Sequence, residues 1–331
     1  MKHPRRPSFD PRLRPRSAQR GVALLVALVL MALVAIITYD VWFSGLFEQR
    51  RTIAALSLEQ GMQYALGAEI WAAEILQQDV QNSTQDHFAE TWATPMPPIP
   101  VDGGQIEGGL EDMQGRFNLN DLIDPSTGAA NPEAVEQFRR LLELVGLEQS
   151  WADKMVDWID ADNVPTIPEG AEDAVYMAQS PPYLAANVPI TSTSEMLALP
   201  QFGIERYRKI APFVAALPAG TPINVCTAPG EVLDSLVQGF RQFSVDPKAL
   251  AQQRASKCFP SLTDLQAAFP PNEWQRILKA NNGTSMVSDN TRFFRLTAVV
   301  TIGTAQFTLY SLLLRDKSGQ VWPILRSWGT D

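Results

Sequence analysis

An uncharged apolar run from Val22 to Tyr39 places the strongest constraint on how this 331-residue chain can fold. As an α-helix, a run of this length spans about 27 Å, close to the ~30 Å hydrocarbon thickness of a bilayer. The preceding residues 1–21 hold seven basic side chains and a single acidic one, Asp10. Because basic flanks stay on the cytoplasmic side, the pattern predicts one membrane helix, with its N-terminus in the cytoplasm and the body across the membrane.

Three interpretations of this segment differ in whether the helix is kept. A cleaved secretory signal peptide needs small residues just after the run, whereas residues 38–42 are Thr-Tyr-Asp-Val-Trp. An ordinary single-pass anchor needs no cleavage site. A leader of the type IV pilin kind fits best, because Gly21 follows Arg20 and directly precedes the apolar run. Prepilin peptidase cleavage after Gly21 would make Val22 the mature N-terminus and leave the helix on the protein.

The helix is predicted to continue beyond the membrane. After Asp40 the apolar residues recur at steps of three or four, which is typical of an amphipathic helix, although ordinary helix packing also explains such a stripe. These positions are Leu58, Met62, Leu66, Ile70, Ala73 and Leu76. We therefore expect a transmembrane and stalk helix over residues 22–92, followed by a linker over residues 93–105, which are rich in proline and glycine.

The charge and the histidine content exclude several functions. The whole chain carries −9 and residues 1–21 carry +6, which leaves −15 on the rest. A body with this much negative charge repels phosphate backbones, and we therefore do not expect nucleic acid as a partner. The only histidines are His3 and His87. Hydrolytic triads need a histidine base and common zinc sites need histidines or several cysteines, so we expect no enzyme.

The body is predicted to be α+β. Two short strands are expected at Gln105–Leu110 and Arg116–Leu119, and alternating apolar residues from Phe294 predict three more at the C-terminal end. Between them lie helix-start signals at Asn131-Pro132, Ser192, Asp246-Pro247 and Ser261. Strands on both sides of a helical block indicate an insertion. We expect the first part of the sheet domain at residues 93–122, the insertion at 123–285 and the last strands at 286–331.

The two cysteines, Cys226 and Cys258, are an even pair in a chain expected to be exported, which favours one disulfide. Two buried free thiols are the alternative. A bond would close a loop of about thirty residues and contribute roughly 3–4 kcal/mol by the chain-entropy relation.

A cluster of carboxylates marks the middle of the chain. Residues 153–173 hold seven carboxylates and one cation, Lys154. The carboxylates are Asp153, Asp157, Asp160, Asp162, Glu169, Glu172 and Asp173. Clustered carboxylates repel one another, so a folded loop of this kind gains from a hard cation, and calcium tolerates irregular oxygen ligand sets. The spacing is not that of an EF-hand. A solvated acidic loop without metal is the alternative.

Several segments resemble one family. Residues 115–122, Gly-Arg-Phe-Asn-Leu-Asn-Asp-Leu, and residues 222–233, which begin Pro-Ile-Asn-Val, resemble stretches of the type II secretion system minor pseudopilin K family. So do Trp158–Asp162 and Gly170–Asp173. Most pilins and pseudopilins have glutamate at the fifth mature position, which is Val26 here. The glutamate is thought to meet the N-terminus of the subunit ahead, so a subunit at the tip gains nothing from a carboxylate in lipid.

The resemblance implies a pilin-like fold, with a long N-terminal helix plus an antiparallel sheet, carrying a large SAM-like helical insertion. It also implies a position at the tip of the pseudopilus, with minor pseudopilins I, J and H as partners and N-methylation of the mature terminus. The calcium ligands that it implies are Asp160, Asp162, Glu172, Asp173 and, more weakly, Glu169. Two rival hypotheses are a minor pilin of a related pilus or competence system and a membrane-anchored periplasmic enzyme that uses the carboxylates.

Overall fold

The computed structural model describes residues 17–280 and 283–329. It divides into two units, residues 1–59 and 60–331. The described part of the first unit is helical throughout and belongs to α1, Ser17–Asn82. Within the described chain, α1 is the one helix long and apolar enough to cross a membrane, and its apolar window is not covered by other residues. Most of the expected leader, residues 1–16, lies outside the described residues.

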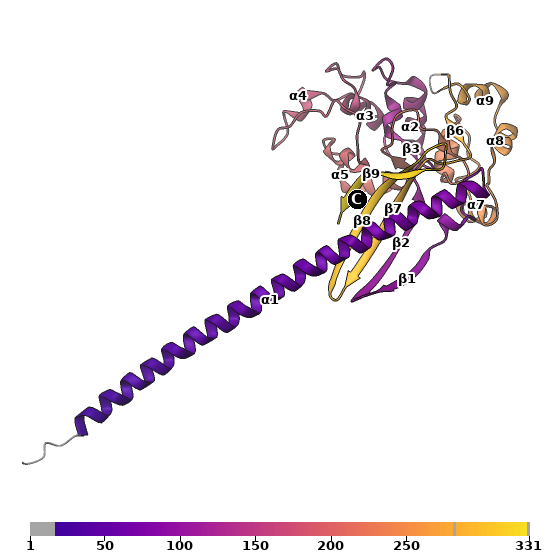
Figure 1. The fold of residues 1–331 in the computed structure, drawn as a ribbon. Helices are drawn as coiled ribbons and strands as arrows, with labels where there is room; N and C mark the ends of the chain where they lie inside the picture. The colour runs from indigo at the N-terminus through magenta and orange to yellow at the C-terminus, as the bar shows by residue number, and fades with distance from the viewer. Residues whose placement is uncertain (1–16, 281–282, 330–331) are drawn as a thin grey trace, which may run out of the picture. The chain divides into compact units, whose positions relative to one another are not determined.

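A five-stranded antiparallel sheet forms the framework of the second unit (Figure 1). Its order is β1-β2-β7-β8-β9. The strands are β1 Met96–Val101, β2 Gly104–Asp112, β7 Phe293–Ile302, β8 Ala305–Arg315 and β9 Val321–Trp328. Strand β7 follows the predicted alternation, and β8 and β9 lie where strands were predicted. The expected linker was wrong in part, because β1 occupies its middle; its prolines are tolerated since β1 is an edge strand.

Residues 60–82 of α1 pack on one face of this sheet. Small residues at helical spacing, Ala65, Ala68 and Ala72, share a core with strand residues such as Leu296 and Val300. A Cβ atom at Gly61 would lie 2.5 Å from the Phe307 ring, so the ring packs here in the space that the missing side chain leaves. The buried Glu69 carboxylate accepts hydrogen bonds from Arg326 of β9 at 2.7 and 2.8 Å. Helix and sheet are thus joined by both apolar and ionic contacts.

The helix ends at Asn82, ten residues before the predicted boundary at 92. The chain then turns back toward the strands, because the Asp86 amide donates to the Asp289 carbonyl at 3.0 Å and the Asp86 carboxylate accepts from the Thr291 amide at 2.6 Å. A short 3-10 helix, Thr91–Ala93, follows before β1. Hydrogen bonds to residues 289 and 291 therefore end the helix earlier than the sequence pattern predicts.

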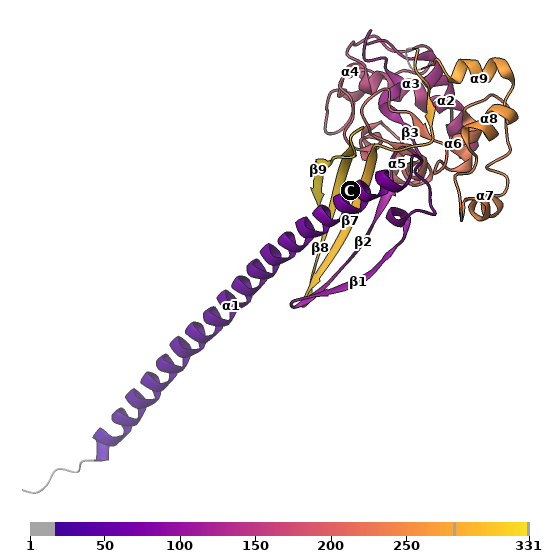
Figure 2. The ribbon, with the colours of Figure 1, turned by 45° about the vertical axis from the view of Figure 1, so that its right-hand side comes forward.

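A helical block lies between β2 and β7 in the chain and gathers beyond one end of the sheet (Figure 2). Its α-helices are α2 Pro132–Leu144, α3 Trp151–Ile159, α4 Asp173–Tyr176, α5 Gly203–Ile210, α6 Gly230–Ser235, α7 Pro247–Arg254, α8 Leu262–Ala268 and α9 Pro271–Ile277. Three 3-10 helices are Leu119–Leu122, Thr193–Ala198 and Ala211–Phe213. Two small parallel ladders join β3 Phe117–Asn118 to β4 Val214–Ala215, and β5 Ile223–Asn224 to β6 Val287–Ser288. One continuous apolar core fills the block.

Three of the α-helices, α2, α7 and α8, begin at the N-cap residues that were predicted for them. The Asn131 side chain accepts from the Glu133 amide, with Pro132 in the first turn of α2. Ser261 and Asp264 form a capping box at α8. Ser192 also begins a capping box, but the element that follows is a 3-10 helix rather than an α-helix. Local capping signals therefore located α2, α7, α8 and one 3-10 helix, whereas α3, α4, α5, α6 and α9 begin without a side-chain cap.

A disulfide links two separate parts of the block. Cys226, just after β5, is bonded to Cys258, just before α8, and their Cα atoms lie 4.6 Å apart. Both side chains are buried in the apolar core. The bond closes a sequence separation of 32 residues around α6 and α7.

Candidate metal centre

Helix α3 and the loop after it bring three carboxylates together. Asp157 and Asp160 lie one turn apart at the end of α3, and Glu172 returns to them from the start of α4. The return is fixed by the core, where the Tyr176 ring packs edge-on against the Trp158 ring at 5.1 Å. Ligand oxygens of Asp157, Asp160 and Glu172 all lie within 4.8 Å of one another. All three side chains are buried.

Three of the six carboxylate oxygens in this cluster have no protein donor among the described residues. Within the described chain, Asp160 Oδ1 and both carboxylate oxygens of Glu172 are buried and accept no hydrogen bond. Burying such a group without a partner costs about 1–3 kcal/mol, and more when it is charged. Three buried acceptors that converge on one point therefore fit a cation between them.

Asp157 is oriented by the backbone of the loop. The Thr166 amide donates to both Asp157 oxygens at 3.1 Å. Gly170 lies against the same carboxylate, and a Cβ atom there would come within 2.2 Å of Asp157 Oδ2. The loop can therefore close on Asp157 only because residue 170 has no side chain.

The electrostatics show the repulsion that a cation would relieve. Burial and the neighbouring Asp162 and Asp157 raise the pKa of Asp160 to about 6. Burial and the charges of Asp157, Asp160, Asp162 and Asp173 raise the pKa of Glu172 to about 7. The donor set consists of carboxylate oxygens, which calcium prefers, so these residues fit the predicted ion.

The structure brings together only part of the predicted ligand set. Asp160 and Glu172 lie in the cluster, whereas Asp162, Asp173 and Glu169 are not among its members. The Asp162 side chain accepts from the Val164 amide at 2.8 Å, and the Asp173 side chain accepts from the Ala185 amide at 3.1 Å. Glu169 is exposed. Hydrogen bonds within the loop thus occupy oxygens of Asp162 and Asp173, which the family resemblance implied as calcium ligands.

Asp157 belongs to the cluster but was not among the predicted calcium ligands. A signal was present, because Asp157 lies three residues before Asp160 and so falls on the same helix face. Asp153, one turn earlier, is different: its carboxylate pairs with Arg139 of α2. Asp153 lies too far from the end of α3 to join the cluster and pairs with α2 instead, whereas Asp157 lies close enough to the loop to join it.

The predicted cleavage site lies in α1. Gly21 and Val22 are both helical, and the Val22 side chain is exposed. A Cβ atom at Gly21 would meet no other atom within 4 Å, so the glycine is not required by packing among the described residues. Recognition by a peptidase remains a sequence-based prediction for this position.

The family of the chain follows from comparison with known proteins. A family model described as type II secretion system protein K matches residues 115–219, which include the acidic loop. The type II secretion system protein K of Pseudomonas aeruginosa is 34% identical over 95% of this chain and 94% of its own length. The chain belongs to the type II secretion system protein K family. The family member from Pectobacterium carotovorum is 36% identical over 95% of this chain and 98% of its own length.

A solved structure agrees with this assignment. One chain in the crystal structure of the GspK–GspI–GspJ complex of the enterotoxigenic Escherichia coli type 2 secretion system is 27% identical, with a TM-score of 0.72. The match covers 85% of this chain and 100% of that one. The predicted pilin-like α+β fold and the predicted family are thereby confirmed, and the chain is a minor pseudopilin of the type II secretion system. The relatives described here are named as secretion-system components.

Proposed function

We propose that this minor pseudopilin sits at the tip of the pseudopilus and supports its assembly and the export of folded proteins across the outer membrane. The observation that carries the proposal is Val26, which stands where other pseudopilins have the glutamate that meets the subunit ahead. The helical block of residues 113–292 supports it, since so large an insertion is hard to bury between subunits within a filament. Its work is binding and geometry rather than catalysis.

The proposed partners follow from the same position. The similar solved chain is in complex with GspI and GspJ, which supports minor pseudopilins I and J as neighbours; H is proposed with them. The apolar α1 residues would lie in inner-membrane lipid, with the N-terminus cytoplasmic and the second unit periplasmic. Prepilin peptidase would process the leader, and the acidic body makes nucleic acid an unfavourable partner.

The mature N-terminus tests the topology and the processing together. In cells with an active prepilin peptidase, intact-mass and terminal-peptide mass spectrometry should give a chain that begins at Val22, with a methyl group on its amine. The matched control is Gly21→Ala, which should keep the basic leader because the peptidase site is lost while α1 gains helix propensity. A wild-type chain that retains its leader, or one that begins near residue 40, would contradict the proposal.

We further propose that Asp157, Asp160 and Glu172 bind calcium and that the ion stabilises the insertion. Chelation of calcium from the full chain in detergent should lower the melting temperature, and added calcium should restore it, because the ion relieves the repulsion between these buried carboxylates. At a calcium concentration one hundred times the Kd, the expected stabilisation is about 2.7 kcal/mol. Differential scanning calorimetry measures the shift.

Two variants make the calcium test specific. Glu172→Gln should lose most of the calcium response, whereas Glu169→Gln should keep it, because Glu169 is an exposed side chain of the same loop. Equal responses in both variants would place the ion elsewhere. An unchanged melting curve of the wild type on chelation would leave the loop as a solvated acidic segment.

A further inference from the structure

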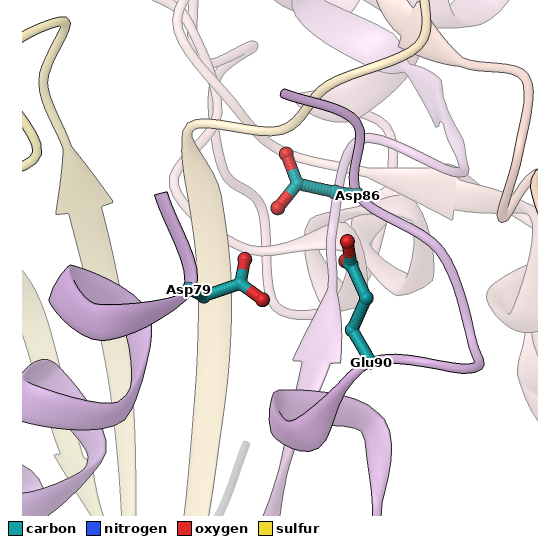
Figure 3. Close-up of side chains that lie close together, drawn as sticks. All are labelled: Asp79, Asp86 and Glu90. Carbon is teal, nitrogen blue, oxygen red and sulfur yellow. The ribbon is translucent and has the colours of Figure 1, made fainter. Parts of the chain in front are cut away.

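A second group of carboxylates lies outside the acidic loop, where the stalk helix ends. Asp79 is in the last turn of α1, Asp86 is in the loop that follows, and Glu90 directly precedes the 3-10 helix Thr91–Ala93. Figure 3 shows the three side chains pointing toward one another. Oxygens of Asp79, Asp86 and Glu90 all lie within 4.8 Å of one another. The relative exposures of Asp79 and Asp86 are 7% and 2%.

Positive side chains compensate the negative charge of these three carboxylates only in part. The buried Arg315 guanidinium donates to Asp79 Oδ2 at 3.1 Å and to both oxygens of Asp86. The His87 imidazole is also near, with its Nε2 atom 3.9 Å from Glu90 Oε1. Three buried carboxylates thus face one permanent cation among the described residues. Uncompensated charge of this kind is costly in a protein interior.

Glu90 supplies the observation that points to a ligand. Its side chain is 8% exposed, and Oε1 is buried without a hydrogen-bond partner in the described chain. The other oxygen, Oε2, accepts from the His87 amide at 2.9 Å and from Trp92 Nε1 at 2.8 Å. These two donors fix the carboxylate and leave Oε1 as its free acceptor, and Figure 3 shows the Glu90 carboxylate directed toward Asp79 and Asp86. An oriented acceptor with no donor is the usual geometry of a cation ligand.

We propose that Asp79, Asp86 and Glu90 bind a hard divalent cation of the calcium class, separate from the ion of the acidic loop. Arg315 does not prevent this, because it donates to Oδ2 of Asp79, and because Asp86 Oδ1 has a second lone pair beside its hydrogen bond to the guanidinium. The ion would join the end of α1 to the loop and, through Arg315, to β8. It would fasten the stalk helix to the sheet at the residue where the helix ends.

The number of bound ions tests the proposal. The full chain in detergent is stripped with chelator, equilibrated with calcium chloride, and assayed for calcium per chain by mass spectrometry of the metal. Glu90→Gln should bind about one ion fewer than the wild type, while its Gln oxygen still accepts from His87 and Trp92. Asp79→Asn should show the same loss and retains an oxygen for Arg315. Glu74→Gln, at an exposed carboxylate of α1 that bonds Gln78, should bind as many ions as the wild type.

The design separates this proposal from the acidic-loop site. If the loop binds no calcium, Glu172→Gln matches the wild type, but the difference between wild type and Glu90→Gln remains. Terbium offers a second readout, since an ion at this site lies beside Trp92 and should show tryptophan-sensitised emission. Because Trp158 also adjoins the acidic loop, this emission is measured in Glu172→Gln, where it should persist, and it should be lost when Glu90→Gln is added to Glu172→Gln. Equal ion counts in wild type, Glu90→Gln and Asp79→Asn would overturn the proposal and leave Arg315 and protons to balance the carboxylates.

Discussion

Replacing Arg315 by methionine should lower the free energy of unfolding by roughly 3–5 kcal/mol, the usual cost of removing one partner of a buried ion pair. The guanidinium binds Asp79, Asp86 and the Thr291 carbonyl, which it approaches to 2.8 Å. Methionine fills a similar volume but donates no hydrogen bond, so two aspartates lose their permanent cation in a buried site. The loss should be large because the desolvation cost of the aspartates remains after their partner is gone.

Chemical denaturation of the full chain in detergent measures this cost. Arg208→Met is the matched control, because Arg208 pairs with Glu205 on the exposed surface of α5 and such pairs contribute about 0–1 kcal/mol. If the proposed cation is bound at Asp79, Asp86 and Glu90, added calcium should reduce the loss in Arg315→Met. A loss below 1 kcal/mol, equal to that of Arg208→Met, would show that Arg315 does not hold the helix end to the sheet.

The elements that the sequence predicted well are those with local signals. Strand β7 alternates because one face packs on α1, and α2, α7 and α8 begin at side chains that cap their own backbone. The pattern in residues 93–105 misled because prolines are typical of linkers, yet β1 is an edge strand where a missing amide costs little. Helix α1 ended early for a reason that no local window contains, namely hydrogen bonds to residues 289 and 291.

The sites divide in the same way. Asp160 and Glu172 lie twelve residues apart and could be predicted as a cluster, although loop closure decided which neighbours joined them. The Asp86–Arg315 pair spans 229 residues of sequence, so only the register of β8 beside the loop after α1 brings its members together. Composition and residue spacing cannot predict so distant a pair, and only the folded structure shows that the two side chains meet.

Loss of the disulfide is the second change expected to have a large effect. Replacing Cys226 and Cys258 together by alanine should lower the free energy of unfolding by roughly 3–4 kcal/mol, because the bond closes a loop of 32 residues and restricts the unfolded chain. Both side chains are buried, so the lost sulfur contacts should add about 1 kcal/mol or less for each residue. Denaturation under oxidising conditions measures the sum.

A reductant separates the two contributions to that sum. Dithiothreitol should destabilise the wild type by the loop-closure part alone and should leave the double alanine variant unchanged, because only the wild type has a bond to reduce. Cys226 and Cys258 enclose α6 and α7, so the reduced protein should first lose hydrogen-exchange protection in these two helices. If reductant left the unfolding curve of the wild type unchanged, the segment after β5 and the segment before α8 would be held together without the disulfide. Arg254 of α7 already joins them, because its guanidinium donates to the Val225 carbonyl at 3.0 Å and to the Phe259 carbonyl at 2.6 Å.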